Sequence, residues 1–244
     1  MKAVLAALVF GIATLPAFAQ YVKITPIGSH PGELCANDRA MILEDPTGVR
    51  LLYDPAHNLT SGDDPRLGTV HLVLLSHMHG DHVGDLKLKA VGEGTCANSA
   101  RVPSQHSTTA EVVAAKNAAM VTTRAMSGFL AAKVNAIQGV NKTIGFCPQS
   151  NGATTVPVAE ICASQTDLGG VFVAKTAEDA RGVEITIVYA SHVNNAPPSL
   201  LSKAQQDVLK ADGGVVEYGP ATGFRSEEHT SELQSRFGIS YAVF

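Results

Sequence analysis

The chain has 244 residues, of which 45% are hydrophobic and 16% charged, and its formal net charge is -4 at pH 7. This length can bury a substantial core and fits one domain. No cluster of Lys and Arg occurs along the chain, so it lacks the basic surface that nucleic-acid binding requires. We therefore expect no nucleic acid among its partners.

Residues 1–19 have the pattern of a secretory signal peptide. Lys2 gives a positive start, residues 4–15 form an apolar run, and Ala17-Phe18-Ala19 is a small-x-small cleavage site before Gln20. The apolar run is shorter than the roughly 20 residues that span a bilayer, which argues against a membrane anchor. We expect cleavage before Gln20, no stable anchor, and a periplasmic or secreted protein.

The first elements after Gln20 are predicted strands. Residues 22–27 alternate imperfectly, and residues 40–44 and 49–53 flank a Pro46-Thr47-Gly48 turn, which predicts a hairpin. Residues 71–76 form a continuous apolar stretch. Alternation is lost when neither face of a strand meets water, so this stretch predicts a central strand covered on both faces.

Helices and a second group of strands follow. Residues 109–120 are rich in Ala, lack Gly and Pro, and follow a Ser107-Thr108 cap, which favours a helix. A second helix is expected over residues 127–137. Residues 141–155 are dense in Gly, Asn, Pro and Ser and indicate a loop, and two strands are expected over residues 170–174 and 183–189. The pattern predicts a mixed α/β (α+β) fold.

The chain has four cysteines, Cys35, Cys96, Cys147 and Cys162. In an exported protein they lie in an oxidising compartment, where disulfides persist. Four cysteines allow three pairings, and the sequence does not choose among them. No C-x-x-C pair occurs, so we expect bridges that tie loops together instead of a zinc knuckle.

Four potential metal ligands follow the apolar strand within six residues: His77, His79, Asp81 and His82. Zinc prefers imidazole nitrogen and carboxylate oxygen, and a catalytic site needs several such ligands around an open position. Residues two apart can point the same way from an extended segment, and Gly80 permits a turn toward a second ion. A plain polar loop is the alternative, but three histidines and one aspartate make coincidence improbable.

Segment 74–82, Leu-Leu-Ser-His-Met-His-Gly-Asp-His, resembles the H-x-H-x-D-H signature of the metallo-β-lactamase superfamily. The resemblance implies an αββα sandwich with two zinc ions between the sheets. Asp54, at the end of the predicted hairpin, resembles the family's acidic strand end, which lies behind the metal ligands. His192, after the predicted strand 183–189, resembles the family's later histidine ligand; a surface histidine in a polar loop is the alternative.

The resemblance implies that His77, His79 and His192 hold one zinc and that Asp81 and His82 contribute to the other. Zinc lowers the pKa of a bound water to about 7, so hydroxide becomes the nucleophile, and Asp81 would orient it. The implied substrate is a small-molecule ester, lactone, amide or phosphoester. We expect His30, His57, His71 and His106 to be structural or surface residues and not metal ligands.

The sequence departs from the family near its C-terminus. Residues 215–224 resemble the strand before the family's Gly-Asp-Thr-Gly turn, yet that turn, with its bridging Asp, and the last His are not found. Residues 225–236 resemble a translated sequencing adapter. We expect a partial metallo-β-lactamase-like domain over residues 20–224 with its sandwich incomplete at the C-terminus, an artefactual tail over residues 225–244, and no ligand role for His229.

Without the bridging Asp and last His, the chain is expected to hold at most one zinc firmly and to hydrolyse substrates slowly. Two alternatives stay open: a metal-binding protein without catalysis, and an inactive truncated fragment. Iron or manganese can also occupy a site of nitrogen and oxygen ligands.

Overall fold

In the computed structural model, the described residues are 21–139, 143–150, 153–157, 160–176, 182–212, 214–228 and 239–241. The predicted signal peptide, His229 and most of the predicted tail lie outside these residues. Within the described ranges, no helix is both long enough and apolar enough to cross a membrane.

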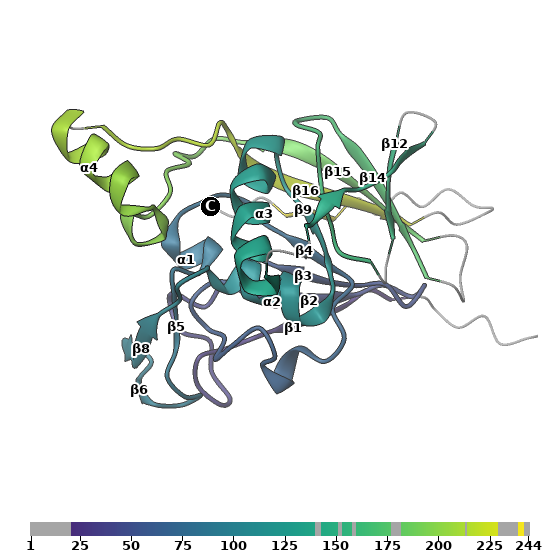
Figure 1. Cartoon of the computed structure of the whole chain (residues 1–244). Helices are drawn as coiled ribbons and strands as arrows, with labels where there is room; N and C mark the ends of the chain where they lie inside the picture. Colours follow the sequence, from purple (N-terminus) through teal and green to yellow (C-terminus); the bar gives the residue numbers. More distant parts are fainter. Residues whose placement is uncertain are drawn as a thin grey trace, which may run out of the picture.

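Two large sheets form the fold (Figure 1). In spatial order, the seven-stranded sheet consists of β1 (Lys23–Pro26), β2 (Met41–Glu44), β3 (Arg50–Tyr53), β4 (Leu72–Leu74), β9 (Ala119–Val121), β13 (Cys162–Ala163) and β10 (Gly145–Phe146). The six-stranded sheet consists of β11 (Gln149–Ser150), β12 (Ala153–Pro157), β14 (Val171–Lys175), β15 (Val183–Ala190), β16 (Ala221–Glu228) and β17 (Ile239–Tyr241).

Smaller elements connect and cover the sheets. Two short hairpins pair β5 (Leu86–Leu88) with β8 (Arg101–Pro103) and β6 (Gly94–Thr95) with β7 (Asn98–Ser99). The helices are α1 (Gly80–Val83), α2 (Thr108–Lys116), α3 (Arg124–Gln138) and α4 (Lys203–Asp212), with 3-10 turns at Pro65–Leu67 and Pro198–Leu200. The mixed α/β composition predicted from the sequence is therefore present.

The predicted hairpin and central strand are confirmed. β2 and β3 pair antiparallel around the turn, and β4 lies between β3 and β9, parallel to both. Leu72 and Leu74 belong to the core shared with the second sheet, whereas Val73 and Leu75 belong to the core beneath the helices. Both faces of β4 are buried, which explains why its sequence is apolar without alternation.

The two sheets face each other through the core that contains Phe172 and Ile185 of the second sheet and Leu51 of the first. Tyr53 and Phe224 meet edge to face across this core, with ring centroids 6.2 Å apart. Each of the four described α-helices contributes a side chain to the other core, on the outer side of the seven-stranded sheet. A helical layer over the six-stranded sheet, which an αββα order includes, is not seen among the described residues.

The predicted helix over residues 109–120 is wrong at its C-terminal end. α2 ends at Lys116, and Asn117 adopts a left-handed conformation (φ 53°) whose backbone N–H donates to Val113. Residues 119–121 form β9, which is completely buried between β4 and β13. Asn tolerates the left-handed conformation, and burial in the sheet outweighs the helix propensity of the Ala-Ala-Met segment.

Other boundaries also differ. The helix expected over 127–137 is α3 and begins three residues earlier, at Arg124. The segment 141–155, expected to be a loop, includes β10, β11 and the start of β12. Of the predicted artefactual tail, residues 225–228 continue β16, which pairs with β15 through Glu228.

The disulfides pair Cys35 with Cys96 and Cys147 with Cys162. The first bridge joins cysteines 61 residues apart, and the second joins cysteines 15 residues apart at the edge of the seven-stranded sheet. No described cysteine is free. All four cysteines therefore serve the fold, as the spacing indicated.

A buried carboxylate stabilises the loop between β3 and β4. The Asp64 side chain is fully buried and accepts hydrogen bonds from the Thr60 N–H (2.9 Å) and from the Arg66 Nε (2.9 Å). Arg66 also donates to the backbone carbonyls of Gly28 and Asn58. Burial raises the pKa of Asp64, but the bonds from Arg66 and Thr60 outweigh burial and lower this pKa from 3.8 to about 2.

We expect Asp64→Asn to destabilise the protein in a pH-dependent way. Because the folded-state pKa is below the unfolded value, the stabilisation is complete above pH 4 and is lost as the pH falls from about 4 to about 2. The substitution should lower the free energy of unfolding by about 2 kcal/mol at pH 7 and by much less near pH 2. Urea titrations at both pH values measure this difference.

The neighbouring Asp63 provides the control, because its side chain is 76% exposed and pairs with Lys116 at 3.4 Å. Asp63→Asn should change the free energy of unfolding by less than about 1 kcal/mol at either pH. An equal loss for Asp64→Asn at pH 7 and pH 2 would contradict the assigned charge effect.

Candidate metal centre

The candidate site lies where parallel strands β3 and β4 end. Asp54 directly follows β3, and Ser76 and His77 follow β4. The chain then stays extended to His79 and turns into the short helix α1, which carries Asp81 and His82. In sheets of this kind, the carboxyl ends of parallel strands are the usual place for a ligand.

A close approach after α1 requires glycine. Gly84 ends the helix in a left-handed conformation (φ 76°). A Cβ atom at this position would lie 1.8 Å from Thr108 Oγ1 and 2.4 Å from the Ala56 carbonyl oxygen. The ligand segment can therefore pack against α2 only with glycine here.

Three histidines converge at this edge. The ring centroids of His77 and His79 are 4.7 Å apart, and the His192 ring lies 4.7 Å from His77 and 4.8 Å from His79. One ring nitrogen from each residue lies within 4.8 Å of the other two. His77 and His79 come from the loop after β4, and His192 follows β15, so the cluster joins the ends of both sheets.

The His77 ring has the protonation state that a metal ligand needs. Its Nδ1 lies 2.9 Å from Ser76 Oγ, whereas its Nε2 is buried without a hydrogen-bond partner. Burial and the neighbouring rings of His82, His79 and His192 lower the pKa of His77 to about 2. The ring is therefore neutral, and neutral imidazole is the form that binds a metal ion.

Asp54 lies directly behind the cluster and is fully buried. It accepts hydrogen bonds from the Ser76 N–H (2.8 Å) and the Ser76 hydroxyl (2.7 Å), and its Oδ2 lies 2.7 Å from Nδ1 of His82. Since the Ser76 hydroxyl donates to Asp54, its oxygen is left to accept from Nδ1–H of His77. Asp54 thus orients His82 directly and His77 through Ser76, and it leaves Nε2 of both rings free.

Asp81 and His82 form a separate pair beside the three histidines. Asp81 Oδ2 lies 3.7 Å from His82 Nε2, and the His82 ring centroid is 4.0 Å from that of His77. The described residues place no third His, Cys, Asp or Glu with this pair in a group suited to one ion. The pair therefore offers two ligands, compared with three in the histidine cluster.

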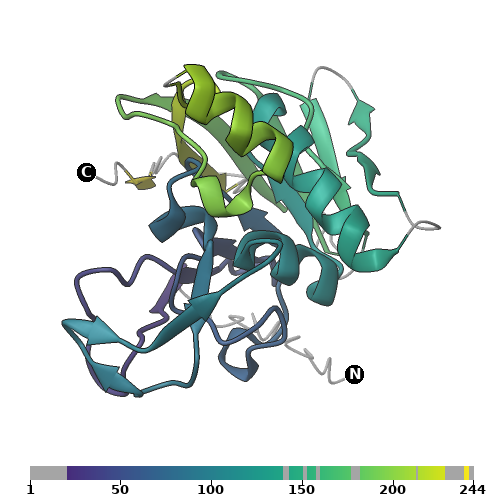
Figure 2. The same cartoon turned by 60° about the vertical axis from the view of Figure 1, so that its left-hand side comes forward.

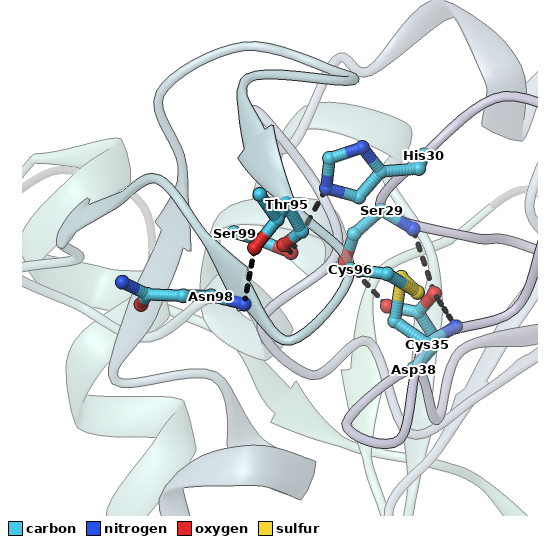
Figure 3. The surroundings of a disulfide bond; sticks show 8 residues. All are labelled: Ser29, His30, Cys35, Asp38, Thr95, Cys96, Asn98 and Ser99. Atoms are coloured by element: carbon cyan, nitrogen blue, oxygen red, sulfur yellow. Dashed lines mark hydrogen bonds between the residues drawn. A yellow bond between two sulfur atoms is a disulfide. The ribbon is translucent and has the colours of Figure 1, made fainter.

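Arg39 approaches the site from the loop that follows Asp38. Figure 3 shows Asp38 beside the disulfide between Cys35 and Cys96. The Asp38 carboxylate accepts from the backbone N–H groups of Ser29 and Cys35, both at 2.8 Å, and Cys35 is bonded to Cys96 beside β6. Arg39 Nε then lies 3.7 Å from Asp81 Oδ2. Nothing local in the sequence marks this arginine, which is about forty residues from the ligand cluster in the chain.

The same loop places Glu33 near the bridge formed by Cys35 and Cys96, and these three side chains are close enough to hold an ion. The sulfur atoms of Cys35 and Cys96 are bonded to each other. Since a cysteine binds a metal as its thiolate, this second group does not offer a metal site while the bridge is intact.

Asn194 fixes the loop that carries His192. Its Oδ1 accepts from the Met78 N–H at 2.7 Å, and its Nδ2 donates to the carbonyls of Tyr218 and Pro220 at 3.2 and 3.3 Å. Asn194 itself is buried. The sequence places Asn194 at the start of a stretch that could line a pocket, but its anchoring role was not predicted, because nothing local distinguishes it from other polar loop residues.

Three of the remaining histidines, His57, His71 and His30, are held by structural interactions. His57 Nε2 lies 2.7 Å from Asp85 Oδ1, His71 Nδ1 accepts from the Arg50 N–H at 2.9 Å, and His30 Nε2 lies 3.3 Å from Ser99 Oγ. None of these three belongs to the three-histidine group. Their placement agrees with the structural roles expected for them.

No protein-family model and no curated protein matches the chain. Among solved structures, the chain is similar to Igni18, a novel metallo hydrolase from the hyperthermophilic archaeon Ignicoccus hospitalis KIN4/I, with a TM-score of 0.41 and 17% sequence identity. The similarity covers 85% of this chain and 56% of that one, so this chain spans little more than half the length of its neighbour. A likeness of this size decides nothing about the activity of this chain.

Proposed function

We propose that the chain is a metal-dependent hydrolase of the metallo-β-lactamase superfamily, with zinc held by His77, His79 and His192. The convergence of these three rings from two sheets carries the proposal. The buried Nε2 of His77, which has no partner, fits it, because a buried polar atom without a partner is costly unless something binds it. Three imidazoles with an open position match a catalytic zinc site.

The surrounding residues supply binding and orientation. Zinc, when bound, makes water more acidic and polarises a carbonyl or phosphoryl oxygen. Asp81 is partly exposed beside the cluster, where its carboxylate can orient an attacking water and accept its proton. Arg39 lies next to Asp81 and can bind a negatively charged group on the substrate. The proposed substrate is a small-molecule ester, lactone, amide or phosphoester.

We further propose that one zinc is held firmly and that a second ion at Asp81 and His82 is weak, since this pair has two ligands. The activity is then expected to be low. The signal-like segment 1–19 supports a periplasmic or secreted location, and the two disulfides are compatible with export.

Removal and return of the metal test this proposal. The protein is treated with a chelator and reloaded with zinc, its metal content is measured, and hydrolysis is followed with p-nitrophenyl acetate, a chromogenic cephalosporin, a lactone and a p-nitrophenyl phosphodiester. We expect about one zinc per chain after gel filtration, and hydrolysis of at least one substrate that the chelator abolishes and zinc restores. Such restoration distinguishes metal-dependent hydrolysis from metal-independent hydrolysis by a contaminant.

Two outcomes would reject the proposal in different ways. Zinc retention without hydrolysis of any substrate would make the chain a metal-binding protein without catalysis. Failure to retain zinc, or iron or manganese supplied in its place, would exclude the metal site itself.

A further inference from the structure

A cavity of about 630 Å³ opens beside His79 and Gly80. Other parts of its lining come from the loop after His192 and from α4. α4 lies at one end of the sandwich (Figures 1 and 2). This volume lies within the range of pockets that hold small molecules. Part of the cavity lining thus belongs to the candidate metal centre. The rest belongs to segments to which the proposed hydrolysis assigns no function.

The walls away from His79 are mainly apolar. They include the side chains of Ala196, Pro197, Leu209, Val215 and Val216. Val215 is 61% exposed although its side chain is hydrophobic. Lys210 is the single Lys, Arg, Asp or Glu among the lining residues, and it is exposed at α4. A ligand in this cavity would therefore meet apolar surface along most of its length.

We propose that this cavity binds the apolar, non-reacting part of the substrate, so that the preferred substrate is an ester, amide or lactone with a long acyl or an aryl group. The inference rests on the proposed hydrolase function, because it needs the reacting bond to lie at His79. Binding energy from such a remote group promotes reaction at the other end of the substrate. The positive charge of Lys210 is compatible with a neutral or negatively charged group at the apolar end of the substrate, and it disfavours a cationic group there.

Chain length of the substrate is the first test. Zinc-loaded protein is assayed with p-nitrophenyl esters from acetate to decanoate. Each methylene that enters the cavity should raise kcat/KM by up to about fourfold until the cavity is filled. Metal-dependent hydrolysis with no rise from acetate to decanoate would overturn the pocket assignment and leave the hydrolase proposal intact.

Two valines of nearly equal exposure give a matched pair of variants. Val215 lines the cavity and is 61% exposed, whereas Val208 on α4 is 60% exposed and does not line it. Val215→Asp places a charge beside the apolar chain and should lower the decanoate to acetate ratio of kcat/KM by about tenfold or more. Val208→Asp should leave that ratio unchanged. Equal ratios in both variants would contradict the assignment.

A binding measurement separates the pocket from the chemistry. The fluorescent probe N-phenyl-1-naphthylamine is added to metal-free protein and displaced with decanoic acid. We expect displacement in the wild type and in Val208→Asp, and binding weakened about tenfold in Val215→Asp. If no ester is hydrolysed but the probe shows this difference, the hydrolase proposal fails and the apolar pocket stands. Absence of probe binding in the wild type would reject the pocket.

Discussion

Replacing His77 with alanine is expected to lower zinc affinity by more than about 100-fold, which exceeds the 10- to 100-fold effect typical of residues behind the ligands. His77 is the most buried of the three histidines, and its free Nε2 faces no protein partner. Loss of this ring leaves His79, half-buried, and His192, exposed. Two imidazoles without the buried third provide a much weaker site.

Zinc titration against a chromophoric chelator measures the affinity directly. Thermal unfolding gives a second readout that does not depend on activity. Zinc at a hundred times its dissociation constant should stabilise the wild-type protein by about 2.7 kcal/mol, and the same zinc concentration should stabilise His77→Ala by less than about 0.4 kcal/mol. Hydrolysis should fall together with zinc occupancy.

His106→Ala is the control, since it also removes one imidazole but from a residue outside the three-histidine group. This variant should keep the wild-type zinc affinity and thermal shift. If His77→Ala binds zinc as tightly as the wild type, the metal site is somewhere else.

Asp54→Asn is expected to weaken zinc binding by about 10- to 100-fold, although Asp54 is not a ligand of the histidine cluster. The carboxylate accepts from Ser76 and faces His82, so it sets which nitrogen of both His77 and His82 carries the proton. An asparagine has the same size and retains one acceptor oxygen, but its NH2 group is a donor and cannot accept the hydrogen bond that the second carboxylate oxygen accepts.

The backbone makes asparagine the suitable replacement. Asp54 has φ 41°, a left-handed conformation that asparagine tolerates and that most other residues do not. The change therefore removes the charge without adding backbone strain. The free energy of unfolding of the metal-free protein should also fall by about 1.5 to 3 kcal/mol, because hydrogen bonds to a buried charge are lost.

Asp45→Asn separates stability from metal binding. Asp45 is also buried and accepts from the Thr47 N–H at 2.8 Å, but it lies in the β2–β3 turn, at the opposite end of the hairpin from Asp54. Its substitution should destabilise the protein and leave zinc affinity unchanged. Zinc affinity that falls equally in both variants would show that general loss of stability, and not the orientation of the histidines, is responsible.

Local patterns in the sequence were sufficient to predict several features of the fold and of the site. The hairpin of β2 and β3 depends on a short turn between two apolar segments, and the apolar run of β4 identifies a strand buried on both faces. His77, His79, Asp81 and His82 are within six residues, so their proximity follows from chain connectivity. These features need no knowledge of distant contacts.

Only the tertiary structure decided the rest. Residues 119–121 form a strand because β4 and β13 bury them, although Ala119 and Met120 favour a helix. Three contacts join segments far apart in the chain. They are the disulfide between Cys35 and Cys96, the approach of Arg39 to Asp81, and the hydrogen bond from Met78 to Asn194, which anchors the loop that carries His192. Side-chain type and local spacing carry no information about such distances, because the packing of the two sheets determines which loops meet at their common edge.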